Sequence, residues 1–160
     1  MAIGGAGTQL NESRDTLINV NAHGESVPSA RFMGGRERDL LQVSEPATEK
    51  AMDQLLERID TAVMLMPSVV ADTGPYPQTT HQWLGQDVTT NPSIQTCAAT
   101  LYLALMTHEC LLLIGADGPT YIEGPLAHDR QYAQMLEAVS ERPVLISNSE
   151  TGTSLSLIHI

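Results

Sequence analysis

One apolar stretch constrains the fold of this chain more than any other feature of its sequence. It begins at Pro92 or Ser93, ends at Gly115 and is apolar on almost every side of the helix that it predicts, so this helix must be buried. Polar residues from Thr107 to Glu109 interrupt the stretch, and polar groups are costly at the centre of a membrane span. The stretch therefore predicts the core helix of a globular domain, with His108 as a hydrogen-bonded helix residue.

The residues after this helix alternate between strand and helix patterns. Residues 120–123 have the pattern of a strand, residues 126–140 that of a helix with one apolar side, and residues 144–147 that of another strand. A strand, a helix and a strand at this spacing form a parallel crossover unit. Ser149 and Thr151 then offer caps for a further helix. The predicted fold class is α/β.

The residues before the core helix predict a hairpin and two helices. Residues 16–32 have the pattern of two antiparallel strands around a turn at Gly24, and residues 37–42 that of a short helix. Ser44 is expected to cap the next helix, with Pro46 in its first turn. The apolar side of that helix would cover a sheet.

A short strand and a long loop are predicted between these helices and the core helix. Residues 61–66 form an aliphatic run of strand length that Pro67 ends. The segment 68–92 is rich in turn residues and is predicted to be a loop that Trp83 anchors. Because loops of this length are often functional, an independent enzyme centred on Trp83 and His81 stays open as an alternative.

Composition excludes several classes of function. The 160 residues suit one domain, and a net charge of −11 works against binding to nucleic acid or an anionic membrane. The single lysine, Lys50, follows no glycine-rich loop, so a phosphate-binding loop of the lysine type is absent. Cys97 and Cys110 would lie about 20 Å apart on one helix and could not form a disulfide. With no signal-peptide pattern in the first residues, we expect a cytoplasmic protein.

One turn is a candidate binding site. Residues 123–129 join the carboxyl end of a predicted strand to the amino end of a predicted helix, which is where open α/β sheets bind ligands. Gly124 has no Cβ and would allow close approach of a flat ligand, although an ordinary strand-to-helix turn has the same pattern. The fragment Gly4–Gly7 lacks the third glycine of a dinucleotide loop. No catalytic pair and no metal site is assigned, since Asp72 and Glu123 have no partner that the sequence positions beside them.

Several separated blocks together resemble one family. The blocks, in chain order, are TLINVNAHGESVPSARFMGGRE at 16–37, MLMPS at 64–68, GPYP at 74–77, YIEGPLAHDRQYAQMLEAVSERPV at 121–144 and SETGTS at 149–154. In this order they resemble the second half of the FGGY-family carbohydrate kinases. The resemblance spans almost the whole chain.

The resemblance implies an actin-like ATPase (ribonuclease H-like) domain, a mixed sheet with an N-terminal hairpin and flanking helices. It would be the second of two domains that close around ATP and a sugar, and the enzyme would transfer the γ-phosphoryl of ATP to a sugar hydroxyl. The family's adenosine motif falls on the 123–129 turn. The implied nucleotide-binding residues are Glu123, Gly124, Pro125, Ala127 and His128. Glu123 replaces the first glycine of the motif, and His128 stands where an asparagine commonly contacts the base.

The resemblance also implies what lies elsewhere. The general base and most of the sugar pocket would belong to an N-terminal kinase domain, and Mg²⁺ would be held mainly by the nucleotide and by that domain. We expect residues 1–155 to be a C-terminal nucleotide-binding domain, incomplete at both ends and inactive alone, and residues 156–160 to be a frayed or foreign tail. The alternative is a non-catalytic nucleotide-binding or interaction module of the same fold.

Overall fold

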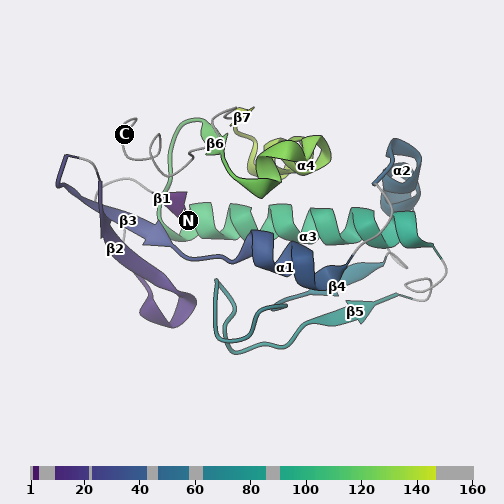
Figure 1. Ribbon diagram of the computed structural model, residues 1–160, viewed down its shortest axis with the longest axis horizontal. Helices are drawn as coiled ribbons and strands as arrows, with labels where there is room; N and C mark the ends of the chain where they lie inside the picture. Colours follow the sequence, from purple (N-terminus) through teal and green to yellow (C-terminus); the bar gives the residue numbers. More distant parts are fainter. Residues whose placement is uncertain are drawn as a thin grey trace.

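The computed structural model describes residues 2–3, 10–21, 23–42, 47–57, 63–85 and 91–146. Helix α3 (Pro92–Leu113) runs along the length of the molecule (Figure 1). Asn91 caps it, because its Oδ1 accepts the Ile94 N–H at 3.3 Å. By length and composition α3 could span a membrane, but 61% of its most apolar window is buried against the rest of the protein. The predicted core helix is confirmed.

Three other helices pack on α3. In the view of Figure 1, helix α4 (Arg130–Ser140) lies above α3, α1 (Gly34–Leu41) lies below it, and α2 (Glu49–Glu57) stands at its amino end. Helix α2 buries Ala51 and Leu55 and exposes Lys50, as its amphipathic pattern predicts.

The strands of the described residues form three small sheets. In the first, β3 (Ser26–Ala30) lies between β1 (Ala2–Ile3) and β2 (Thr16–Val20), antiparallel to both. Strand β4 (Met64–Met66) pairs antiparallel with β5 (Gln82–Leu84). Strand β6 (Thr120–Ile122) pairs parallel with β7 (Val144–Ile146). The hairpin is confirmed, with Gly24 at φ +80° in its turn, and so is the parallel crossover unit.

The single mixed sheet that we expected is not formed by the described residues. Instead, the antiparallel β1–β3–β2 sheet and the parallel β6–β7 pair are separate. The physical reason is the shortness of the pairing, because β1 contributes two residues and β6 and β7 three each. The described part of the chain is nevertheless α/β.

Two predicted element boundaries are wrong. Helix α2 begins at Glu49, after Ala47 and Thr48 that are not helical, so its cap is not Ser44. Instead Thr48 Oγ1 accepts the Ala51 N–H at 3.2 Å. Helix α1 begins three residues before the predicted residue 37, because the Glu37 N–H already donates to the Met33 carbonyl at 2.8 Å.

The predicted 68–92 loop contains a strand that the sequence did not reveal. Strand β5 pairs with β4 through Leu65 and Trp83, and its two outer residues are exposed. A strand of three residues with polar neighbours has too little alternation to be recognised. Residues 43–46, 61–62, Ser149, Thr151 and 156–160 lie outside the described residues.

Within the described ranges, the core is divided among three clusters along α3. The largest lies between α3 and α4, the second at the amino end of α3 beside α2, and the third at its carboxyl end beside the hairpin. Their fully or nearly buried α3 members include Leu103 and Ala104 in the first, Cys97 and Ala98 in the second, and Cys110 in the third. Helix α3 is the element that all three clusters share.

Candidate functional site

The 123–129 turn follows the carboxyl end of β6. Residues Pro125–His128 form a short 3₁₀ helix, η2, and Asp129 then has extended backbone angles before α4 begins. The predicted continuous helix over 126–140 is therefore wrong. It is divided because Asp129 is the N-cap of α4, accepting the Tyr132 N–H on Oδ1 at 3.0 Å, and an N-cap residue is not helical.

The turn has an open side and a buried side. Gly124 is exposed with φ +75° and ψ −157°, and a Cβ built on it would meet no atom within 4 Å. Pro125 and His128 are also exposed, and Glu123 is half-buried. Ala127 is buried in the core cluster between α3 and α4, and its N–H donates to the Gly124 carbonyl at 3.0 Å. The predicted site residues thus lie in one turn, with Gly124 facing open space.

Helix α1 supports this turn from the side. A Cβ on Gly34 would lie 3.3 Å from Leu126 Cδ1 and 3.0 Å from Phe32 Cε1, so the absence of a side chain lets the first turn of α1 approach η2 closely. Farther along α1, Arg38 Nη2 forms an ion pair with Asp129 Oδ2 at 3.1 Å. Neither contact was predicted. The one sequence signal for them is the Gly34-Gly35 pair after the predicted hairpin.

The residue next to Arg38 holds α1 on its other side. The Glu37 carboxylate accepts the Val70 N–H on Oε1 at 3.0 Å and the Tyr102 hydroxyl on Oε2 at 2.7 Å. Its side chain is 1% exposed, and this burial raises its pKa above the ordinary value of 4.5, against the lowering effect of the Tyr102 hydrogen bond. Burial also raises the pKa of Tyr102. Helix α1 is thereby fixed to α3 and to the loop after β4.

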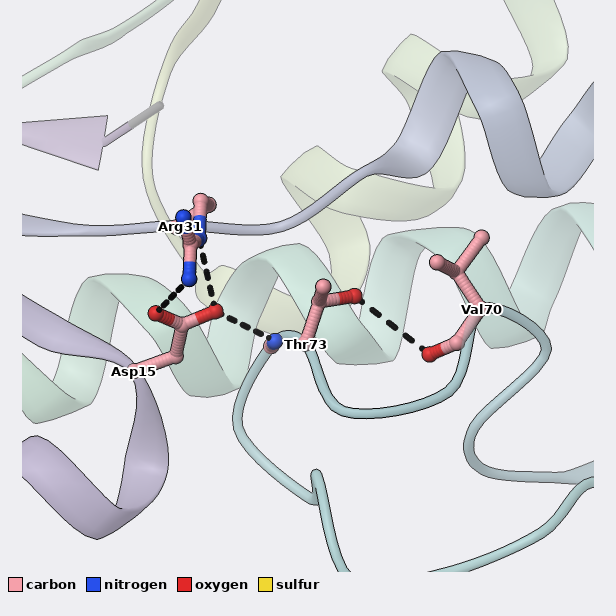
Figure 2. A network of polar contacts seen from close by, with 5 residues as sticks. Asp15, Arg31, Val70 and Thr73 are labelled. Atoms are coloured by element: carbon pink, nitrogen blue, oxygen red, sulfur yellow. Dashed lines mark hydrogen bonds and ion pairs between the residues drawn. The ribbon is translucent and has the colours of Figure 1, made fainter.

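A second polar network holds that loop against the hairpin (Figure 2). Asp15 Oδ2 accepts the Gly74 N–H at 2.9 Å, and both carboxylate oxygens bind the Arg31 guanidinium at 2.9 Å. Within the loop, the Thr73 hydroxyl donates to the Val70 carbonyl at 3.3 Å. The Asp15 carboxylate thus joins the hairpin side, through Arg31, to the loop, through Gly74, and we call this network a structural clasp.

Arg14 extends this clasp to α3. It donates to the Pro75 carbonyl at 3.0 Å and to Glu109 Oε1 at 2.7 Å, and its guanidinium lies 4.9 Å from the centre of the Tyr76 ring. The loop between β4 and β5 is therefore tied to the hairpin, to α1 and to α3.

The other sequence candidates do not converge on a site. Asp72 and His81 are exposed, and Trp83 lies half-buried in β5, where it packs against two core clusters. Nδ1 of His108 is buried without a hydrogen-bond partner among the described residues, so the expectation of a hydrogen-bonded histidine is wrong for this atom. The Gly4–Gly7 fragment lies outside the described residues.

The cysteines are structural in the described part of the chain. Cys97 and Cys110 are both free and buried. Burial raises the pKa of Cys97 and raises that of Cys110 to about 12. Within the same residues no three His, Cys, Asp or Glu side chains are grouped so that they could hold a metal ion.

Comparison with known proteins decides the family. Residues 1–160 match the family described as carbohydrate kinase FGGY, C-terminal domain. The chain belongs to this family. Among solved structures, this FGGY domain is similar to the crystal structure of a carbohydrate kinase from Novosphingobium aromaticivorans, with 31% sequence identity and a TM-score of 0.74. The similarity covers 94% of this chain and 33% of that one, so the FGGY domain spans about a third of the related kinase. No curated protein matches it.

Proposed function

We propose that this chain is the nucleotide-binding C-terminal domain of an ATP-dependent carbohydrate kinase. The complete enzyme would transfer the γ-phosphoryl of ATP to a sugar hydroxyl, and the 123–129 turn would form the adenine-binding wall. The observation that carries the proposal is Gly124, whose positive φ and open surroundings leave room for a flat ring against the backbone. Membership of the FGGY family supports the reaction class.

The roles proposed for the turn follow from its two sides. Gly124 and Pro125 would present backbone to one face of the adenine, while His128 would contact its edge. Ala127 would keep the turn thin because its small side chain is buried beneath it. Glu123, half-buried at the end of β6, would begin the turn.

We also propose an actin-like ATPase fold of the ribonuclease H-like type, supported by the similarity to a solved carbohydrate kinase. The general base would belong to an N-terminal kinase domain, and Mg²⁺ would be held mainly by the nucleotide phosphates and that domain. Catalysis of phosphoryl transfer depends on positioning and charge neutralisation. On this reading the chain contributes nucleotide positioning, is inactive alone and acts in the cytoplasm.

Exposed apolar side chains next to the turn support the proposal that another domain covers this surface. Tyr121 and Leu145 are paired across β6 and β7 and are 62% and 44% exposed. We propose that this exposed apolar pair is a contact surface for another part of the protein. The remaining kinase domain is the partner that the proposed function supplies.

A matched pair of glycine substitutions tests the nucleotide site. Gly124→Ala and Gly118→Ala place a methyl group at equal φ, +75°, and in equally open surroundings, so the two substitutions are matched in φ and in the space around the new methyl group. We expect the unaltered chain to bind ATP with a Kd in roughly the millimolar range. Gly124→Ala should weaken binding about tenfold, whereas Gly118→Ala should leave it unchanged, as measured by isothermal titration calorimetry.

Equal effects of the two substitutions would contradict the assignment of the site. Turnover distinguishes the remaining alternative: if the complete protein binds ATP but phosphorylates none of a panel of ketoses and aldoses, the non-catalytic nucleotide-binding module is correct instead.

A further inference from the structure

The ion pair between Arg38 and Asp129 lies where the 123–129 turn meets α1. Arg38 Nη2 and Asp129 Oδ2 are 3.1 Å apart, and the side chains are 38% and 18% exposed. An ion pair with this exposure contributes little to stability through its charges alone. The ion pair matters instead for the position of the turn relative to α1, as the other contacts of the two residues indicate.

Three polar atoms of Asp129 link the end of the turn to its neighbours. Its Oδ1 caps α4 through the Tyr132 N–H at 3.0 Å, and its own N–H donates to the Leu126 carbonyl at 3.1 Å. Oδ2 is then the atom left for Arg38. Asp129 therefore joins three elements: its backbone N–H binds η2 at Leu126, and its carboxylate binds the first turn of α4 and Arg38 of α1.

Helix α1 is itself fixed from the opposite side. Glu37 binds Tyr102 and the Val70 N–H, so α1 cannot follow a movement of the turn without breaking buried hydrogen bonds. At the amino end of α1, Gly34 packs closely on Leu126. The turn thus packs against a helix that is itself anchored by hydrogen bonds. The ion pair of Arg38 with Asp129 is the polar contact that holds the turn against this helix.

We propose that Arg38 is a positioning residue for nucleotide binding, because its ion pair with Asp129 sets the position of the turn that carries Gly124. This inference rests on the proposed function, in which the turn binds adenine. Arg38 does not contact the nucleotide. It limits the movement of η2, so that the binding surface is formed before the ligand arrives.

Two substitutions break the pair while sparing the other contacts. Arg38→Met keeps the length and much of the packing of the side chain but removes the charge. Asp129→Asn keeps an oxygen that can cap α4, since asparagine is as good an N-cap as aspartate. Arg38→Lys keeps the charge, and Arg36→Met is the control, because Arg36 is exposed on the same helix and forms no ion pair within the described residues.

The first measurement needs no nucleotide. Hydrogen exchange of the Ala127 and Asp129 amides, both hydrogen-bonded within the turn, reports how firmly the turn is held. We expect Arg38→Met and Asp129→Asn to accelerate this exchange about fivefold, the ratio that about 1 kcal/mol produces. Arg36→Met should leave it unchanged. Unchanged exchange in both Arg38→Met and Asp129→Asn would overturn the inference, whatever their Kd values for ATP.

The second measurement is the Kd for ATP at a temperature where every variant is folded. Arg38→Met and Asp129→Asn should each weaken binding about fivefold, the double variant no more than either single one, and Arg38→Lys should restore part of the affinity. Faster exchange with an unaltered Kd would mean that the pair is only structural, and the inference would be wrong while the proposed function stands. Failure of the unaltered chain to bind ATP, or any other nucleoside triphosphate, would overturn both.

Discussion

At the scale of single residues, Glu37 combines a carboxylate with an almost fully buried position. Both partners are hydrogen-bond donors, which suits the ionised form, yet burial is the larger effect and raises the pKa. The folded protein therefore holds this proton to a higher pH than the unfolded chain does. The consequence is a dependence of stability on pH that this one residue causes.

We expect Glu37 to lower the free energy of unfolding as the pH rises. Below about pH 4.5 the group is protonated in both states; above it the unfolded chain loses the proton first, so the free energy of unfolding falls until the raised pKa is passed. Glu37→Gln removes this fall, because glutamine can accept from Val70 N–H and donate to Tyr102 without titrating. Urea unfolding of both proteins from pH 4 to pH 7 should show that the free energy of unfolding of Glu37→Gln rises relative to that of the unaltered chain as the pH increases.

Asp39→Asn, on the exposed side of the same helix, controls for the loss of one acidic group. A difference in unfolding free energy between the unaltered chain and Glu37→Gln that stays constant from pH 4 to pH 7 would contradict this explanation.

At the scale of elements, side chains of other segments hold the loop between β4 and β5 against the rest of the domain. Asp15 holds it through the Gly74 N–H (Figure 2), and the neighbouring Arg14 through the Pro75 carbonyl. Asp15→Asn keeps a side chain that tolerates the left-handed backbone at φ 58° but loses the charge. We expect faster hydrogen exchange of the Gly74 amide and a loss of about 1 kcal/mol in the free energy of unfolding.

Asp117→Asn is the matched control for Asp15→Asn. The Asp117 carboxylate also accepts a loop N–H, from Gly118 at 2.8 Å, but lies in another loop. If both substitutions changed exchange at Gly74 alike, the clasp would not be what holds the β4–β5 loop.

The elements that sequence predicted correctly are those with a local signal. Helix α3 has an apolar run, and the hairpin has a glycine in its turn. In the parallel crossover unit the sequence pattern changes clearly from strand to helix and back to strand. Strand β5 was missed because its three residues carry no alternation. The sequence also placed the turn with Gly124, because a strand end followed by glycine and a helix is a local pattern.

The support of the turn could not be predicted. Arg38 and Asp129 are far apart in the sequence, and each is an ordinary charged residue of a polar segment. Glu37 lies among glycine, arginine and aspartate, so no apolar face of α1 indicated that it would be buried. Contacts of this kind arise from the tertiary packing of α1 between α3 and η2, which no short-range pattern encodes.

At the scale of the whole molecule, the three core clusters predict the reactivity of the thiols. The thiolate is the reactive form of cysteine, and burial raises the pKa of both cysteines, that of Cys110 to about 12. In native protein at pH 8 we expect iodoacetamide to modify neither thiol over minutes, and in urea to modify both. Mass spectrometry distinguishes the two products, and rapid labelling of Cys110 in the native chain would contradict its burial beside the hairpin.

The two thiols also lie at opposite ends of α3, Cys97 in the cluster beside α2 and Cys110 in the cluster beside Ala30. The chain therefore carries two intrinsic probes of partial opening. Under mild denaturant, labelling of Cys97 before Cys110 would show that the α2 end of α3 unfolds before the hairpin end. Simultaneous labelling of both thiols would show that the core along α3 opens as one unit.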